Sequence, residues 1–293
     1  MSEHETPETP EAPDGSKEIS HPVREGLSAF GRLLGRAAGQ VGATIADAYM
    51  ALDPDLKRHL AQMPLVGLTM LAPGRPKVEA RGEGDSKAVL FVHGLGGHRG
   101  NFIPMLGYFW WEGSNRTYAV GFEERSSLEA MAEELQRLIE EVTQVNGLEG
   151  VDTVDLVAHS MGGLVCRLAL EDPTTRARVR KLVTLGTPHN GTHAARFLAT
   201  QSALALRPDS SLLDRLDQQL PWAGPPDWPE ATAYWSQADI VLLPPEAARL
   251  DGASTPELET MTHYGYLLHP IGWRAVYQTL HGAVTPPRDS EPS

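Results

Sequence analysis

The stretch from Val154 to Gly163 constrains the fold more than any other part of the sequence. It reads Val-Asp-Leu-Val-Ala-His-Ser-Met-Gly-Gly, so an apolar strand runs into Ser160 and a helical pattern follows. Ala158 and Gly162, two positions before and after the serine, are small enough to let the backbone turn sharply without a Cβ clash. Such a turn presents the hydroxyl beside a helix N-terminus, where a developing negative charge is favoured. Ser160 is therefore the candidate nucleophile, and the alternative is a serine at an ordinary helix start.

Apolar strands alternate with helical patterns on both sides of this stretch. The run Ala88–Val92 is continuously apolar, as in a strand buried on both faces, and Thr117–Val120 and Lys181–Leu185 are further strands. A helix is predicted to begin at Ser126, where Glu129 would complete a capping box. This alternation predicts the α/β class, with a mostly parallel central sheet that carries helices on both faces.

The composition of the chain divides its 293 residues into four regions. Residues 1–22 form an acidic, proline-containing tail that is expected to be disordered, because it has little apolar surface to bury. Residues 23–75 are predicted to be a helical segment, residues 76–282 the main domain, and residues 283–293 a flexible tail. Between the expected strands of the main domain, residues of about 192–230 lose the regular pattern and are interpreted as a helical cap insertion.

The helical segment has two competing interpretations. Its apolar residues recur at helical spacing, at Leu27, Phe30, Leu34, Val41 and Ile45. This stripe favours docking on the main domain or on a partner protein, and the alternative is a peripheral contact with a membrane surface, through this helix or the cap. The net charge of −13 at pH 7 provides no basic surface for a nucleic acid, so none is expected as a partner.

The cysteine content and the N-terminal residues exclude several classes of protein. The chain has one cysteine, Cys166, which rules out an intramolecular disulfide and a cysteine cluster for a metal; no metal or other cofactor is expected. The first residues lack the basic and apolar regions of a secretory signal, and no apolar run is long enough to span a bilayer. The sequence thus predicts a cytoplasmic protein, with peripheral membrane association as the alternative.

A serine nucleophile needs a general base that can accept its proton. In sheets with this type of turn the acid and then the histidine follow the serine along the chain. Five histidines lie beyond Ser160, and they are His189, His193, His263, His269 and His281. His263 is the predicted base because it follows a loop and precedes an expected helix entry, Tyr-Gly-Tyr-Leu-Leu. His269, which precedes Pro270, is the reserve candidate.

Asp239 is the predicted acid that orients the base. It follows the expected strand Ala233–Trp235, at the point where a loop should leave the carboxyl edge of the sheet. Three further aspartates beyond Ser160 fit the role less well. Asp214 and Asp217 fall in the cap with the pattern of solvated helix faces, and Asp251 precedes a glycine in an expected turn.

The oxyanion donors are predicted from the segment His93-Gly94-Leu95-Gly96-Gly97, which directly follows a buried strand. Glycines allow backbone N–H groups to turn towards a ligand. The predicted donors are the amides of Leu95 and of Met161, the residue after the nucleophile. His93 itself is expected to make a structural hydrogen bond.

Taken together, these motifs resemble the bacterial lipase branch of the α/β-hydrolase superfamily. The resemblance rests on the His-Gly segment at 93–97, the Ala-His-Ser-Met-Gly turn at 158–162, Leu-Gly-Thr-Pro-His-Asn-Gly-Thr at 185–192 and the acid loop at 239–245. It also includes His263 ahead of Leu267-Leu268, and it covers residues of about 85–282. The resemblance implies an α/β-hydrolase fold with a helical cap, a structural role for His189 and Asn190, and no cofactor. The departures are Ala158 in place of glycine, the missing signal peptide and disulfide, and the added N-terminal segment.

The activity that the resemblance implies is carboxylic ester hydrolysis through an acyl-enzyme. The substrate would be a small-molecule or lipid ester, and medium or long acyl chains are expected because the cap is rich in apolar residues: Phe197, Leu198, Leu204, Leu206, Leu212, Leu213 and Trp222. Plain packing of these residues onto the core is the alternative. A thioesterase, a polyhydroxyalkanoate depolymerase and an acyltransferase would use the same triad. A non-catalytic scaffold of this fold, which binds a membrane or a partner, is the alternative from another class.

Overall fold

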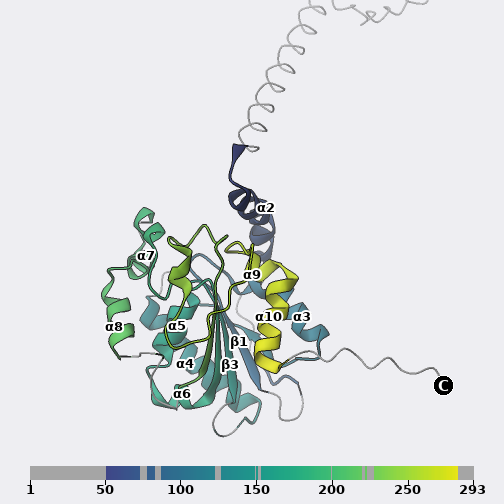
Figure 1. Cartoon of the computed structure of the whole chain (residues 1–293). Helices are drawn as coiled ribbons and strands as arrows, with labels where there is room; N and C mark the ends of the chain where they lie inside the picture. The colour runs from purple at the N-terminus through teal and green to yellow at the C-terminus, as the bar shows by residue number, and fades with distance from the viewer. Residues whose placement is uncertain are drawn as a thin grey trace, which may run out of the picture. The chain divides into compact units, whose positions relative to one another are not determined.

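The structure is a computed structural model that describes residues 51–72, 78–82, 87–122, 127–148, 150, 153–198, 200–219, 222 and 228–282. The predicted tails, 1–22 and 283–293, and the part of the predicted helical segment before residue 51 lie outside these residues. From Asp53 onwards the chain forms one compact unit (Figure 1). Its elements in chain order are α2 (Pro54–Thr69), β1 (Ala88–Val92), η1 (Arg99–Phe102), α3 (Ile103–Trp111), β2 (Thr117–Ala119), α4 (Leu128–Val145), β3 (Val154–His159), α5 (Gly162–Ala169), α6 (Pro173–Arg178), β4 (Val179–Leu185), η2 (His193–Phe197), α7 (Gln201–Ala205), α8 (Ser211–Gln219), β5 (Glu230–Tyr234), η3 (Pro245–Ala248), α9 (Gly265–Leu268) and α10 (Pro270–His281).

The centre of the unit is a parallel sheet of five described strands in the order β2-β1-β3-β4-β5. The β1 strand is buried along its whole length, as its continuous apolar sequence predicts. Strand β3, which leads to Ser160, lies in the middle with β1 and β4 as its neighbours. The carboxyl ends of these central strands therefore lie side by side, and the loops that leave them can share one site.

Helices cover both faces of the sheet (Figure 1). Alternate residues of β1 contribute to different cores, with Leu90 in one and Phe91 in the other. The first core includes α4, α5 and α8, and the second includes α3, α9 and α10. Cys166 lies on α5 inside the first core, fully buried, as its apolar neighbours predict.

Helix α2 is held against the loops at the carboxyl edge of the sheet. Near its start, the Arg58 side chain donates to the carbonyl oxygen of Thr260 over 3.1 Å. In its middle, Gln62 accepts a hydrogen bond of 2.6 Å from the Thr262 hydroxyl. At its end, Thr69 accepts from the Asn101 side chain over 2.8 Å. The helix therefore bridges the loop before α9 and the turn η1.

One helix start differs from the prediction. The N-cap of α4 is Ser127, whose hydroxyl accepts a hydrogen bond from the amide of Ala130 over 3.2 Å. The predicted capping box placed this cap at Ser126, which lies outside the described residues, so that prediction was wrong by one position. Two adjacent serines offer the same capping chemistry, and the buried stripe of the helix selects between them. Among the described residues, no helix has the length and apolar character needed to cross a membrane.

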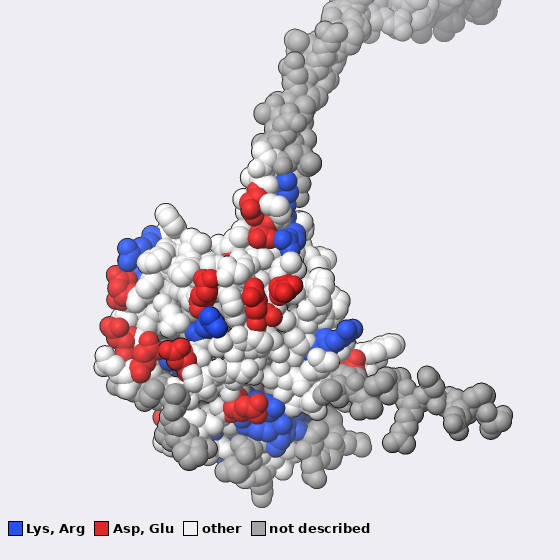
Figure 2. Space-filling view, in the orientation of Figure 1, with Lys and Arg blue, Asp and Glu red and all other residues white. Residues whose placement is uncertain are grey.

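The described surface carries its charges in small groups. Figure 2 shows Lys, Arg, Asp and Glu side chains of one face in separate patches with uncharged areas between them. Some charged side chains of the described residues form ion pairs, such as Arg215 with Glu171, at 2.9 Å, which joins α8 to the loop before α6. Arg167 on α5 pairs with Asp217 on α8 at 3.1 Å, so two ion pairs hold the cap helix α8 on the main domain.

Candidate active site

Ser160 occupies the sharp turn between β3 and α5 that the sequence predicts. Its φ of 55° is positive, which side chains with a Cβ rarely adopt. The turn is held on both sides, since the Ser160 amide donates to the carbonyl oxygen of Leu185 over 2.9 Å and its carbonyl oxygen accepts from the Thr187 hydroxyl over 2.8 Å. Backbone strain of this kind, fixed by its surroundings, is typical of a nucleophile at the tip of a sheet.

Two glycines make this turn possible by their lack of a side chain. A Cβ at Gly162 would lie 2.5 Å from the carbonyl oxygen of Val92, so the turn crosses directly over the end of β1. A Cβ at Gly94 would lie 2.6 Å from the Cβ of Ser160. Real Cβ atoms do not approach so closely, so glycine at both positions lets the 93–97 loop lie against the nucleophile.

The predicted acid and base are in direct contact. Asp239 Oδ2 lies 2.8 Å from Nδ1 of His263, and both side chains are buried. A carboxylate only accepts hydrogen bonds, so Nδ1 carries the proton and donates it to Asp239. In the neutral ring this leaves Nε2 unprotonated and able to accept a proton. The other carboxylate oxygen of Asp239 accepts from the Val241 amide over 3.1 Å, which fixes the carboxylate plane.

Ser236, which follows β5 by two residues, ties the acid loop to the base loop. Its buried hydroxyl accepts hydrogen bonds from the amides of Ala238, over 3.2 Å, and Met261, over 3.1 Å. These two amides belong to the turns that carry Asp239 and His263. Ser236 could not be predicted from the sequence, because a serine in a turn has no distinctive neighbours.

Ser160 and His263 line the same small cavity. Its volume is about 20 Å³, which is room for roughly one water molecule. The lining residues come from four parts of the fold and are Gly94, Leu95, Gly97, Asn101, His159, Ser160, His263 and Tyr264. Asp239 lies behind His263 and is fully buried. The structure thus brings together the predicted nucleophile, base and acid.

The predicted oxyanion donors flank Ser160. Leu95 lines the cavity and Met161 is the residue at the start of α5. Neither amide has a backbone acceptor among the described residues, so both N–H groups are available to a ligand. The turn that presents Leu95 is closed by a hydrogen bond of 3.0 Å from the Gly97 amide to the carbonyl oxygen of Gly94.

Helix α2 lies close to the acid–base pair. The centroid of the His59 ring lies 5.6 Å from that of Tyr264, and the Tyr264 ring lies 5.7 Å from the ring of His263. Burial, and then the neighbouring His263, lower the pKa of His59. This helix belongs to the predicted N-terminal helical segment. The sequence did not predict its contact with the site, because the residues of α2 that make this contact are polar and form no recognisable motif.

Several other candidate histidines and acids lie in different surroundings. His269, the reserve base, is exposed and caps α10 by accepting from the Ile271 amide over 3.3 Å. His93 donates to the carbonyl oxygen of Gly94 over 3.0 Å, the structural bond that was expected. Among the alternative acids, Asp217 pairs with Arg167 and Asp251 is exposed in a turn.

None of the described residues of the cap lines the cavity at Ser160. Four of the seven residues predicted to hold an acyl chain are buried in the first core, and they are Leu206, Leu212, Leu213 and Trp222. For these four the expectation of an acyl-binding role is corrected to plain packing, because their side chains are already buried in the core of the fold. Phe197, Leu198 and Leu204 are exposed.

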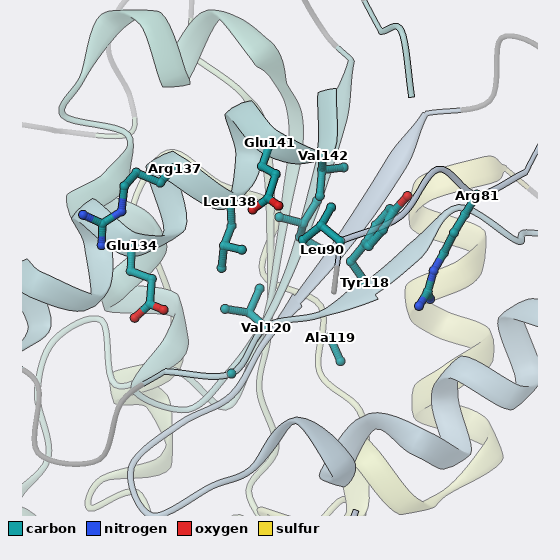
Figure 3. A pocket seen from close by; sticks show the side chains of 12 residues that line it. Arg81, Leu90, Tyr118, Ala119, Val120, Glu134, Arg137, Leu138, Glu141 and Val142 are labelled. Carbon is teal, nitrogen blue, oxygen red and sulfur yellow. The ribbon is translucent and has the colours of Figure 1, made fainter. Parts of the chain in front are cut away.

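A larger cavity of about 440 Å³ lies elsewhere, between α4 and the edge strand β2 (Figure 3). Its lining includes the apolar Leu90 and Val120 and the charged Arg81 and Glu134. Its described lining includes no serine, cysteine or histidine, so it offers no nucleophile paired with a base. The small cavity at Ser160 is therefore the candidate active site despite its size.

Two fully buried histidines should make the stability depend on pH. Burial lowers the pKa of His159 and of His189 well below its ordinary value, so both stay neutral in the folded chain. Below pH ~6.5 the unfolded chain takes up protons at these positions and the folded chain does not. We expect the free energy of unfolding to fall with decreasing pH, by about 1.4 kcal/mol per pH unit for each histidine. Urea unfolding at pH 7.5, 6.0 and 5.0 measures this, and replacing His189 by glutamine should reduce the slope by the share of one histidine, about 1.4 kcal/mol per pH unit. Equal stability at pH 7.5 and 5.0 would contradict it.

The comparisons with known proteins concern the family and the fold. The family model "Domain of unknown function (DUF7379)" matches residues 68–217. The matched part includes Ser160, Leu95 and Met161, whereas Asp239 and His263 lie beyond it. The acid and the base are thus identified here from the sequence order and the geometry alone.

Solved structures share the fold at low sequence identity. The mature lipase BlEst2 from Bacillus licheniformis matches with a TM-score of 0.59 and 17% identity over 71% of this chain and 99% of its own. Lipase B from Aspergillus fumigatus matches with a TM-score of 0.56 and 17% identity over 71% of this chain and 55% of its own. The product of gene lin2722 from Listeria innocua matches with a TM-score of 0.53 and 18% identity over 69% of this chain and 96% of its own. These likenesses confirm the predicted α/β-hydrolase fold.

Proposed function

The chain belongs to the family described as Domain of unknown function (DUF7379), and we propose that it is a serine-dependent carboxylic ester hydrolase. The observation that carries the proposal is the hydrogen-bonded pair of His263 and Asp239, at 2.8 Å, with His263 lining the same cavity as the strained Ser160. A buried histidine with this partner, in a cavity that it shares with the serine, is what the serine needs to become a nucleophile.

The proposed reaction has two steps. In the first, Ser160 Oγ attacks the ester carbonyl carbon while His263 Nε2 takes the hydroxyl proton and then gives it to the leaving alcohol. In the second, water attacks the acyl-serine, His263 takes the proton of that water, and the acid leaves as the Ser160 hydroxyl is restored. Asp239 stabilises the charged ring in both steps, and the amides of Leu95 and Met161 hold the oxyanion.

The likeness in fold to lipases supports an ester as substrate without identifying it. A lipid ester is our proposal for the substrate, because apolar side chains are exposed near the end of α2, just after this helix, and on the cap. Leu68 is 62% exposed, Leu71 is 78% exposed and Phe197 is 85% exposed. Such residues favour a peripheral contact with a lipid surface. The cavity of about 20 Å³ has no room for an acyl chain, so the substrate must displace part of its lining.

A substrate panel tests this proposal. Hydrolysis is measured for p-nitrophenyl esters from acetate to palmitate, for a matched thioester, and with an added alcohol as acyl acceptor. We expect ester hydrolysis with an initial burst of about one equivalent, and higher kcat/KM for medium or long chains. Faster turnover of the thioester, or transfer to the alcohol, would identify the related activities. A folded protein that turns over none of these would contradict the proposal and favour a scaffold.

The acid can be tested by replacing Asp239 with asparagine. The amide would donate to Nδ1 of His263, so the proton of the neutral ring would move to Nε2 and the ring could no longer accept the Ser160 proton. We expect kcat to fall by about 10⁴. Steady-state kinetics measure this, with Asp251→Asn in the exposed turn as the matched control. Loss of activity in both variants, or in neither, would contradict the role of Asp239.

A further inference from the structure

His159 lies between the nucleophile and the base and takes no part in the two steps above. It is the last residue of β3, directly before Ser160, and its side chain is 4% exposed. Its side chain also belongs to the lining of the Ser160 cavity. A histidine buried this completely must satisfy its ring nitrogens within the protein.

The ring of His159 reaches the base itself. Its Nε2 lies 2.8 Å from the backbone carbonyl oxygen of His263. A carbonyl oxygen only accepts, so Nε2 carries the proton and donates it. Burial lowers the pKa of His159 far below its ordinary value, and the nearby His263 lowers it further. The ring is therefore neutral with its proton fixed on Nε2.

The two rings also pack on each other. Their centroids lie 4.6 Å apart with an angle of 51° between the planes. The other titratable groups around them are Asp239, His59 on α2, His93 after β1 and Tyr264. Asp239 forms a hydrogen bond with the side chain of His263. The ring of His159 forms a hydrogen bond with the backbone carbonyl oxygen of His263.

We propose that His159 is a positioning residue, which fixes the backbone of His263 so that the ring of the base stays in place beside Ser160. The inference rests on the proposed function, because it assigns a purpose to the geometry of that base. The bond spans 104 residues of sequence and joins the chain segment of the nucleophile to the chain segment of the base. A displacement of about 1 Å in a reacting group can cost about 10² in rate.

The test compares two variants with a matched control. His159→Phe keeps an aromatic ring and loses the donor, whereas His159→Gln keeps an N–H donor at similar reach. His189→Phe is the control, since His189 is also fully buried and neutral, and its Nε2 lies 3.0 Å from the Thr184 hydroxyl, outside the cavity lining. kcat, KM and the unfolding temperature are measured for each, with the best ester of the panel.

We expect His159→Phe to lower kcat by about 10² with KM changed less than about threefold, and His159→Gln to recover most of the loss. His189→Phe should keep kcat within about threefold at a comparable loss of unfolding temperature. Unchanged kcat in His159→Phe, or an equal loss in His159→Phe and His189→Phe, would overturn the inference. An inactive wild-type protein would instead refute the proposed function.

A measurement on the unaltered protein covers the case in which His159→Phe does not fold. Nitrogen–proton NMR of the histidine rings identifies which nitrogen carries the proton. We expect a neutral His159 ring with a slowly exchanging proton on Nε2 between pH 5.5 and 8. A neutral ring with its proton on Nδ1 would exclude the hydrogen bond and with it the positioning role.

Discussion

Replacing Ser160 by alanine is expected to abolish ester hydrolysis, with kcat lower by a factor on the order of 10⁶. The hydroxyl is the atom that forms the acyl-enzyme, and no other described serine or cysteine lines the cavity. Alanine keeps the Cβ, so the positive φ of 55° is no more strained than in the native turn. The unfolding temperature should therefore stay close to that of the wild type.

The measurement is steady-state hydrolysis of the best ester, with circular dichroism to show that the fold is kept. Ser114→Ala, in the turn after α3 and away from the cavity lining, is the matched control and should have wild-type kcat. Wild-type activity in Ser160→Ala would show that another group is the nucleophile. The site assigned here would then be wrong.

Replacing His263 by alanine is expected to lower kcat by a factor on the order of 10⁵–10⁶, because Ser160 loses the group that accepts its proton. Asp239 would remain buried without its hydrogen-bond partner at 2.8 Å, so some loss of stability is also expected. Assay at a temperature well below the unfolding midpoint separates the two effects.

His269→Ala distinguishes the predicted base from the reserve candidate. His269 is exposed and accepts from the Ile271 amide at the start of α10, so its loss should lower the free energy of unfolding by about 1 kcal/mol and leave kcat unchanged. The opposite pattern, with a normal His263→Ala variant and an inactive His269→Ala variant, would move the role of the base to His269.

The predictable part of the fold and site is the part that depends on local pattern. The apolar run of β1, the small residues around Ser160 and the order of acid and base along the chain reflect steric and topological rules that act on few residues. Those rules led to a parallel sheet and to Ser160, Asp239 and His263, which the structure brings close together.

The features of the site that could not be predicted depend on contacts between residues that are far apart in the sequence. The bond from His159 to His263 spans 104 residues and that from Thr262 to Gln62 spans 200 residues. No periodicity encodes such pairs. The burial of Leu212 and Trp222 shows a related limit, because an apolar residue in a cap can face either the substrate or the core, and the sequence shows only that it is apolar.

The most direct test of the triad is to map a fluorophosphonate adduct by peptide mass spectrometry. The probe reacts only with a serine that has been activated by its base. We predict one adduct per chain on the peptide with Ser160, none in Ser160→Ala, and strongly slowed labelling in His263→Ala. An adduct on a different residue, or a folded wild-type protein that is not labelled, would contradict the account.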